Sequence, residues 1–171
     1  MSDLLGTIEN LADRYAAGIV QPSEVVAAYT DQISKQDPKL GAFQSIFLDE
    51  AMEQAHAADK ALAAEYGLGP LHGIPFALKN IYDCKGQICT NGSMALKDRV
   101  SPVTGTVVHR LLAAGGILIG RTKTVEHAFG AWGTNQKMGS PRNPWKGDNH
   151  HISGGSSSGS AVATAAGMAV C

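Results

Sequence analysis

Residues 69–80 read GPLHGIPFALKN, and this stretch marks the point at which the character of the chain changes. Proline and glycine interrupt its first half, and the short run Ile74 to Leu78 that follows is entirely apolar. A short apolar run bounded by such residues is typical of a strand buried on both faces. We therefore predict a strand over 74–78, with Lys79 and Asn80 at its end.

The residues before this strand carry helical patterns. Apolar side chains recur at helical spacing over residues 4–15, which predicts a first helix closed by Gly18. A second helix is expected over 22–36, because the residue before Pro38 should avoid the helical conformation. The remaining elements predicted here are a strand over 42–48 and an alanine-rich helix over 50–66 that is closed by Gly67.

The residues after the strand alternate between a helix and short extended segments. We predict a helix over 103–114, a strand over 117–119 and a helical turn or two over 124–129. A long loop that holds Trp132 and Trp145 then runs to about residue 155. This strand, helix, strand succession predicts an α/β layered fold.

The composition excludes several classes of protein. The chain has 171 residues, 44% of them hydrophobic, and its 14 basic and 15 acidic residues give a net charge of -1. It is long enough to bury a core without disulfides, and it has no surplus of positive charge for a nucleic-acid backbone. The sequence begins without the basic and apolar segments of a secretory signal, and no apolar run reaches the roughly 18 residues of a membrane span. We expect a cytoplasmic protein that does not bind membranes.

The cysteines and three motifs have structural explanations. Cys84, Cys89 and Cys171 lack the spacing of a zinc site and are interpreted as ordinary thiols, and the six histidines predict no metal site. Residues 115–122, GGILIGRT, have the spacing of a phosphate-binding loop with arginine for lysine, but their glycines follow a helix and precede a strand, which indicates a turn. Residues 155–159 satisfy the G-x-S-x-G pattern of α/β-hydrolases, yet no Asp, Glu or His follows to complete a triad.

The combination that can carry chemistry is Lys79 with the run SGGSSSGSA at residues 153–161. Taken separately, a lysine that ends a strand is usually solvated and a Gly/Ser run is usually a flexible linker. This run leads directly into the apolar segment AVATAAGMAV, so we interpret it as a tight loop packed inside the fold. An unpaired run of backbone amides at the start of the following helix would be a natural site for an anion or an oxyanion.

A set of residues in a fixed order also extends along the chain. Its members are Gly73-Ile74-Pro75, Lys79, Asp83, Gly86, Thr90, Gly92-Ser93, Ala113-Ala114-Gly115, Gly120, Thr122, Glu126, Ala128, Asn143-Pro144-Trp145, Gly154-Gly155-Ser156-Ser157 and Gly159-Ser160. In order and spacing this set resembles the amidase signature family, and the resemblance covers essentially the whole chain, including Ser23-Glu24 and Asp37-Pro38. Two departures from the family pattern are Ser158 in place of a usual glycine and Asn80 in place of a frequent acid.

The resemblance implies hydrolysis or transfer at amide C–N bonds through a Ser-cisSer-Lys arrangement, in a mixed sheet flanked by helices and with no cofactor. It assigns the catalytic positions to Lys79 and Ser156, with a cis peptide bond before Ser156, and the lining of the substrate pocket to Gly130 and Trp132. A lysine is a general base only when neutral, which requires burial or nearby positive charge to lower its pKa from about 10.4. It would relay a proton through Ser156 while a second serine attacks the carbonyl carbon.

The resemblance places that second serine in a later Asp-x-Gly-Gly-Ser stretch, beyond Cys171. We therefore expect residues 1–171 to be the N-terminal portion of a single amidase domain, with a helical segment over about 1–68 and an α/β signature segment over about 69–171. The expected partners are a small-molecule amide substrate and the remainder of the amidase, as a second segment or chain. Nucleic acid enters only for a tRNA amidotransferase subunit, and the oligomeric state, a homo-oligomer included, stays open. The alternative function is a non-catalytic fragment or scaffold subunit of an amidase or amidotransferase complex.

Overall fold

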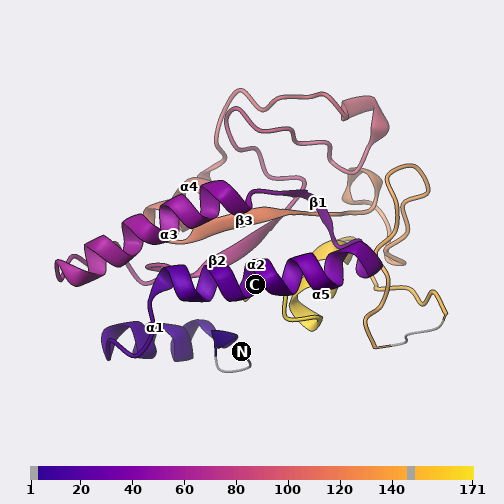
Figure 1. Cartoon of the computed structure of the whole chain (residues 1–171). Coiled ribbons are helices and arrows are strands. Elements are labelled where there is room, and N and C mark those ends of the chain that lie inside the picture. Colours follow the sequence, from indigo (N-terminus) through magenta and orange to yellow (C-terminus); the bar gives the residue numbers. More distant parts are fainter. Residues whose placement is uncertain (1–3, 146–148) are drawn as a thin grey trace.

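The computed structural model describes residues 4–145 and 149–171 and is built around a small mixed sheet (Figure 1). The strands are β1 (Phe43–Ile46), β2 (Pro75–Lys79) and β3 (Ile117–Thr122), in the order β1-β3-β2. β2 runs parallel to β3, whereas β1 runs antiparallel to it. A mixed sheet flanked by helices confirms the predicted α/β layered fold.

Helices cover both faces of the sheet. Buried side chains of α2 (Pro22–Leu40), α3 (Leu48–Ala63) and α5 (Ser158–Ala165) pack together against Ile117 and Ile119 of β3. On the other face, Val108 of α4 (Thr106–Ala113) packs with Leu118 and with β2 side chains. The outer helix α1 (Ile8–Ala16) lies against α2. Short 3-10 helices span Met94–Leu96 and Glu126–Ala128.

The strand predicted over 74–78 is present as β2, and its apolar side chains are buried as expected. Ile74, Phe76 and Leu78 are each less than 5% exposed. The outer edge of β2 is partly covered as well, because the Ala77 amide donates a 3.0 Å hydrogen bond to the Cys171 carbonyl. The segment after α5 therefore returns to the strand that ends in Lys79.

The prediction that the second helix ends before Pro38 is wrong, because α2 continues to Leu40 and contains this proline. Proline has no backbone N–H, so Pro38 removes one hydrogen bond from the end of α2. Asp37 Oδ1 accepts hydrogen bonds from the Ala42 and Phe43 amides at 2.6 and 3.2 Å. Gly41 adopts a left-handed conformation (φ 62°) and donates to the Asp37 carbonyl, so the glycine ends the helix.

Other helix boundaries differ from the expected ones as well, and α1 begins at Ile8 rather than near residue 4. α3 ends at Ala63 rather than near Tyr66, because Glu65 takes a left-handed conformation (φ 57°) and its amide donates to the Leu62 carbonyl. α4 begins at Thr106, three residues later than predicted. The strand predicted over 117–119 extends to Thr122, because Arg121 is fully buried and continues the pairing with β2.

The three cysteines agree with the expectation of ordinary thiols. Cys84, Cys89 and Cys171 are free thiols, and the first two are buried whereas Cys171 is exposed. Within residues 4–145 and 149–171, no group of three His, Cys, Asp or Glu side chains is arranged to hold a metal ion. No helix in these ranges combines the length and apolar character needed to cross a bilayer.

Candidate active site

Lys79 ends β2 and points at the serine with which the resemblance pairs it. Its Nζ lies 2.8 Å from Ser156 Oγ and donates a hydrogen bond to it. The backbone of Lys79 pairs with Thr122 on β3, so the sheet fixes the position of the Lys79 Cα atom. Burial lowers the pKa of the Lys79 amine below its ordinary value, since desolvation disfavours the charged form. The shift favours the neutral amine that a general base requires.

Two hydrogen bonds to its carbonyl oxygen fix the backbone of Ser156. The Thr124 hydroxyl donates to the Ser156 carbonyl oxygen at 2.8 Å, and the Val125 amide donates to the same oxygen at 3.2 Å. The peptide bond between Gly155 and Ser156 is cis. These two donors leave the Ser156 hydroxyl directed at Lys79.

Close backbone packing explains Gly155 and Gly159 of this run, whereas Gly154 takes a left-handed conformation (φ 74°). A Cβ atom added at Gly155 would lie 2.7 Å from the Gly130 carbonyl oxygen and 2.8 Å from the Gly133 nitrogen. A Cβ atom added at Gly159 would overlap the Ala42 carbonyl oxygen and the Lys123 nitrogen. The run is a loop packed against other backbone segments, as predicted, and not a flexible linker.

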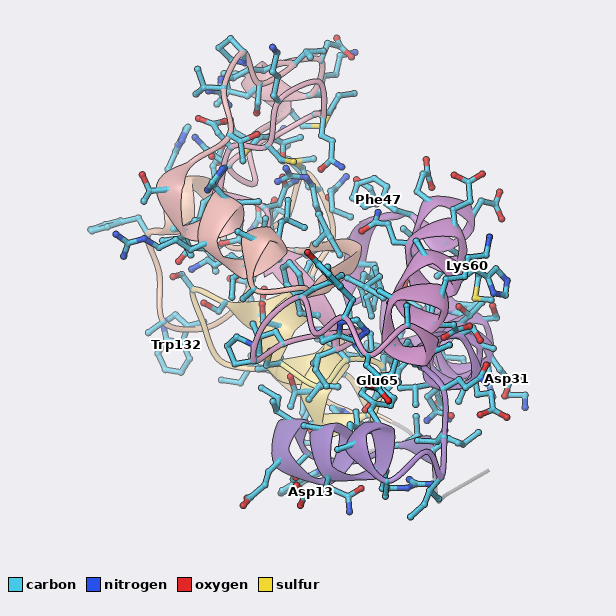
Figure 2. The ribbon with its side chains drawn as sticks, turned by 90° about the vertical axis from the view of Figure 1, so that its left-hand side faces the viewer. Asp13, Asp31, Phe47, Lys60, Glu65 and Trp132 are labelled. Carbon is cyan, nitrogen blue, oxygen red and sulfur yellow. The ribbon has the colours of Figure 1, made fainter. Side chains whose placement is uncertain are left out.

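The structure thus brings Gly130, one of the two predicted substrate-binding residues, next to the loop that carries Ser156. Trp132 lies on the same loop, but its side chain is 69% exposed and stands at the edge of the molecule, opposite Lys60 on α3 (Figure 2). Neither residue has a hydrogen bond to Lys79 or Ser156 within the described part of the chain. Their role in substrate binding stays a prediction.

The expectation of an unpaired run of amides at the start of α5 is wrong at Gly159. The Gly159 amide donates to the Lys123 carbonyl at 2.9 Å, and the Ser158 hydroxyl lies 3.5 Å from the same oxygen. Ser158 is buried, and Ser160 Oγ lies 2.7 Å from Thr122 Oγ1. The first turn of α5 is therefore docked on the ends of the strands, which removes its middle amide as a donor to a ligand.

Sequence reasoning missed several buried polar residues around this pair. Thr124 and Asn135 are 2% and 6% exposed, yet no motif drew attention to their side chains. Asn80, noted only as a departure from the family pattern, is 1% exposed and donates to Thr90 Oγ1 at 2.8 Å. Their positions in the sequence are the one available signal, because Asn80 directly follows Lys79 and Asn135 lies three residues after Trp132.

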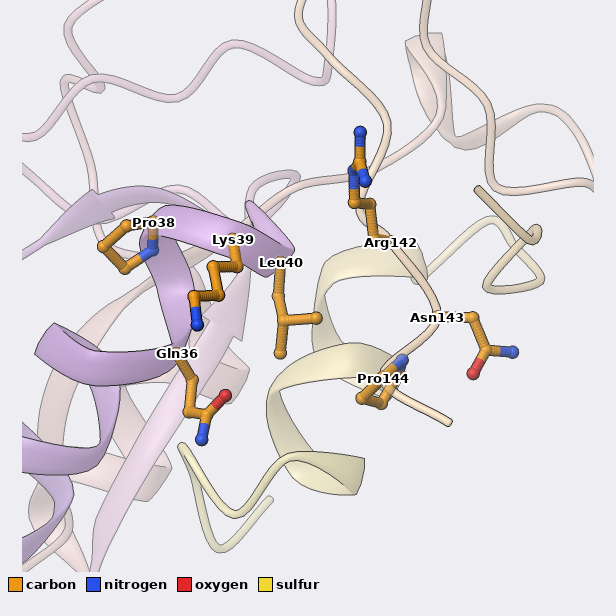
Figure 3. A pocket seen from close by; sticks show the side chains of 7 residues that line it. All are labelled: Gln36, Pro38, Lys39, Leu40, Arg142, Asn143 and Pro144. Carbon is orange, nitrogen blue, oxygen red and sulfur yellow. The ribbon is translucent and has the colours of Figure 1, made fainter. Parts of the chain in front are cut away.

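A hollow that is separate from this pair lies at the C-terminal end of α2. It has a volume of about 540 Å³ and is lined by residues that include Lys39, Arg142 and Asn143 (Figure 3). In the close view, the Lys39 and Arg142 side chains point in different directions and do not converge on a common centre. Its lining contains neither Lys79 nor Ser156, so we place the candidate chemistry at the hydrogen-bonded pair and not at this hollow.

Comparisons with known proteins identify relatives of this chain. A family model described as Amidase matches residues 24–171. The chain is 42% identical over 167 residues to a glutamyl-tRNA(Gln) amidotransferase subunit of Acidothermus cellulolyticus, and the match covers 97% of this chain and 33% of that protein.

Solved structures give the same result. The native peptide amidase of Stenotrophomonas maltophilia superposes with a TM-score of 0.85 at 32% identity, over 95% of this chain and 34% of that one. A bacterial aryl acylamidase of the amidase signature family superposes with a TM-score of 0.87 at 28% identity, over 99% of this chain and 35% of that one. The chain spans about a third of the length of each of these relatives.

Proposed function

Because this chain belongs to the amidase family, we propose that it supplies the base and the bridging serine of an enzyme that cleaves amide C–N bonds. The observation that carries the proposal is the 2.8 Å hydrogen bond between Lys79 Nζ and Ser156 Oγ. A partly buried amine with a lowered pKa next to a serine hydroxyl is the arrangement that general base catalysis needs. No cofactor is required for this chemistry.

In the proposed mechanism, the neutral Lys79 amine takes the proton of the Ser156 hydroxyl as Ser156 takes the proton of a second serine. The deprotonated second serine attacks the amide carbonyl, and the same path returns a proton to the leaving amine. The chain spans about a third of the length of its relatives, and the family pattern places the second serine in a later stretch. We therefore assign the acyl nucleophile to the part of the enzyme that residues 1–171 do not include.

This proposal extends to the organisation of the chain. We propose that residues 1–171 belong to one amidase domain, because β1 from the N-terminal segment pairs with β3 from the segment that carries the motifs. The remaining partners are an amide substrate and the rest of the enzyme, in the cytoplasm. Gly130 and Trp132 are proposed to line the substrate pocket, supported by the packing of Gly130 against Gly155.

A second candidate follows from the sequence relatives. The 42% identity to a glutamyl-tRNA(Gln) amidotransferase subunit favours a glutamine-type amide as the substrate and a multisubunit complex as the setting. The peptide amidase and the aryl acylamidase favour a free-standing hydrolase. Ammonia release from glutamine, compared with release from aryl and peptide amides, distinguishes the two.

The test of the proposed function is replacement of Lys79 in the intact amidase that carries these residues. Lys79→Ala should lower turnover at least about a hundredfold, which is what a lost general base typically costs. Lys79→Arg should fail as well, because a guanidinium stays protonated. Lys60→Ala on the exposed surface of α3 is the matched control and should leave turnover unchanged. Near-normal turnover of Lys79→Ala would refute the assignment, and a wild-type enzyme that cleaves no amide would favour a scaffold subunit.

A further inference from the structure

Four buried polar side chains lie around Lys79 and Ser156, and the proton relay uses none of them. Asn80, Thr90, Thr124 and Asn135 are each at most 6% exposed. Buried polar groups are costly unless their hydrogen bonds are satisfied, so an arrangement of this kind needs an explanation. Their hydrogen bonds form two chains, one starting beside Lys79 and the other at Ser156.

The first chain continues from the end of β2. Asn80 follows Lys79, and its amide nitrogen donates to the Thr122 carbonyl at 3.0 Å, so the pairing with β3 extends one residue past the lysine. The Asn80 side chain donates to Thr90 Oγ1 at 2.8 Å, and the same oxygen accepts the Gly92 amide at 3.1 Å. This chain connects the lysine to the loop at Gly92.

The second chain starts at the carbonyl of Ser156. Thr124 Oγ1 donates to that carbonyl at 2.8 Å, and the Val125 amide donates to it at 3.2 Å. The position of the serine backbone therefore depends on the position of Thr124.

Asn135 joins the two chains. Its Nδ2 donates to the Gly92 carbonyl at 2.7 Å and to the Thr124 carbonyl at 3.1 Å. Its Oδ1 accepts from the Lys137 and Met138 amides at 3.2 and 3.0 Å, which fixes the side chain from the opposite end. Both donors and the acceptor oxygen of the amide are thus in use.

We propose that Asn135 is a positioning residue that closes a ring of contacts running from Lys79 through Asn80, Thr90, Gly92, Asn135 and Thr124 to Ser156. This proposal rests on the proposed function. It explains how Lys79 and Ser156 are kept at hydrogen-bond distance. A displacement of about 1 Å by a distant substitution can cost about a hundredfold in rate. The buried hydrogen bonds of Asn135 can therefore affect catalysis although Asn135 does not contact the substrate.

The first test is Asn135→Asp in the intact enzyme. Aspartate has the same shape but loses the NH2 group and turns a carboxylate oxygen toward the two carbonyl oxygens, which repels them. We expect kcat to fall about 10- to 100-fold with little change in KM, because the pair is displaced while the substrate pocket remains. The matched control is Asn143→Asp, whose side chain also bridges a carbonyl and an amide, at Ile152 and Trp145, but outside the ring. The control should keep the wild-type kcat.

Thr124→Val is the second test, because it keeps the side-chain shape and removes only the bond to the Ser156 carbonyl. The inference predicts a lowered kcat with KM retained in both variants, at temperatures well below their melting points. It is overturned if the folded variants keep the wild-type kcat, or if the loss in Asn135→Asp equals its unfolded fraction while Thr124→Val is fully active. A wild-type enzyme inactive on every amide refutes the proposed function instead, so the two failures are distinguishable.

Discussion

Gly159→Ala tests the docking of α5 on the sheet, on which the position of Ser156 depends. The added methyl group would overlap the Ala42 carbonyl oxygen and the Lys123 nitrogen, and it would lie 2.8 Å from the Lys123 carbonyl oxygen. All three are backbone atoms in or next to the strands, so no side-chain rotation relieves the overlap. The helix must move away from the sheet to accept the methyl group.

Two opposing effects determine how much Gly159→Ala changes the free energy of unfolding. In an exposed helix, replacing glycine by alanine would stabilise by about 1 kcal/mol through helix propensity. Overpacking costs about 1–3 kcal/mol, and loss of the 2.9 Å hydrogen bond from the Gly159 amide to the Lys123 carbonyl adds about 1 kcal/mol. We expect a net destabilisation of about 1–3 kcal/mol.

The assay is urea unfolding of the intact protein followed by circular dichroism, with kcat measured in parallel at a temperature where the variant is folded. Gly67→Ala is the matched control, because a Cβ atom at Gly67 would meet nothing within 4 Å and the residue is exposed. It should change stability by less than about 0.5 kcal/mol. A Gly159→Ala protein as stable as the wild type would show that α5 does not pack on the strands as described.

Three further predictions concern the titrating and reactive groups. A fluorophosphonate should label a serine other than Ser156, and mass spectrometry of the digest would contradict the relay role if the adduct lies on Ser156. Because burial lowers the pKa of Lys79 from 10.5, kcat/KM should rise with pH over a range that lies below pH 10.5. Lys79→Arg should abolish this rise. The Arg99 hydrogen bond holds the pKa of Asp83 at about 2, so this carboxylate stabilises the fold above its unfolded pKa of about 3.9 and the stabilisation disappears as pH falls toward 2. The pair is partly exposed, so Asp83→Asn should remove about 1 kcal/mol or less of this acid dependence in urea titrations at pH 2–6.

Local patterns are sufficient to predict the elements that hold the lysine. The run before Lys79 contains only apolar residues, so its burial on both faces can be predicted from its composition. The strand ends at the charged residue Lys79. The close packing of the Gly/Ser run is predictable too, because an apolar helix follows it and small residues permit backbone contact.

Hydrogen bonds between separate segments decide what cannot be predicted. Pro38 is a different case, because it stays in the helix while the neighbouring Asp37 carboxylate accepts bonds from Ala42 and Phe43, just beyond the helix end. Asn135 is separated by 43 residues from Gly92, to which it donates, and an asparagine in a polar loop gives no sign of such a partner. The Gly159 amide is paired, against expectation, because its acceptor, Lys123, lies in a different part of the chain.

The distance along the chain between Lys79 and Ser156, 77 residues, affects how the site forms during folding. No local segment contains both groups, so their contact closes one of the larger loops of the described chain, and the entropy of that closure is lost before any gain is returned. Contacts of this range slow folding, and here the contact also requires β2, β3 and the start of α5 to be assembled. The pair therefore exists only in the completed fold, after α5 has docked on the sheet.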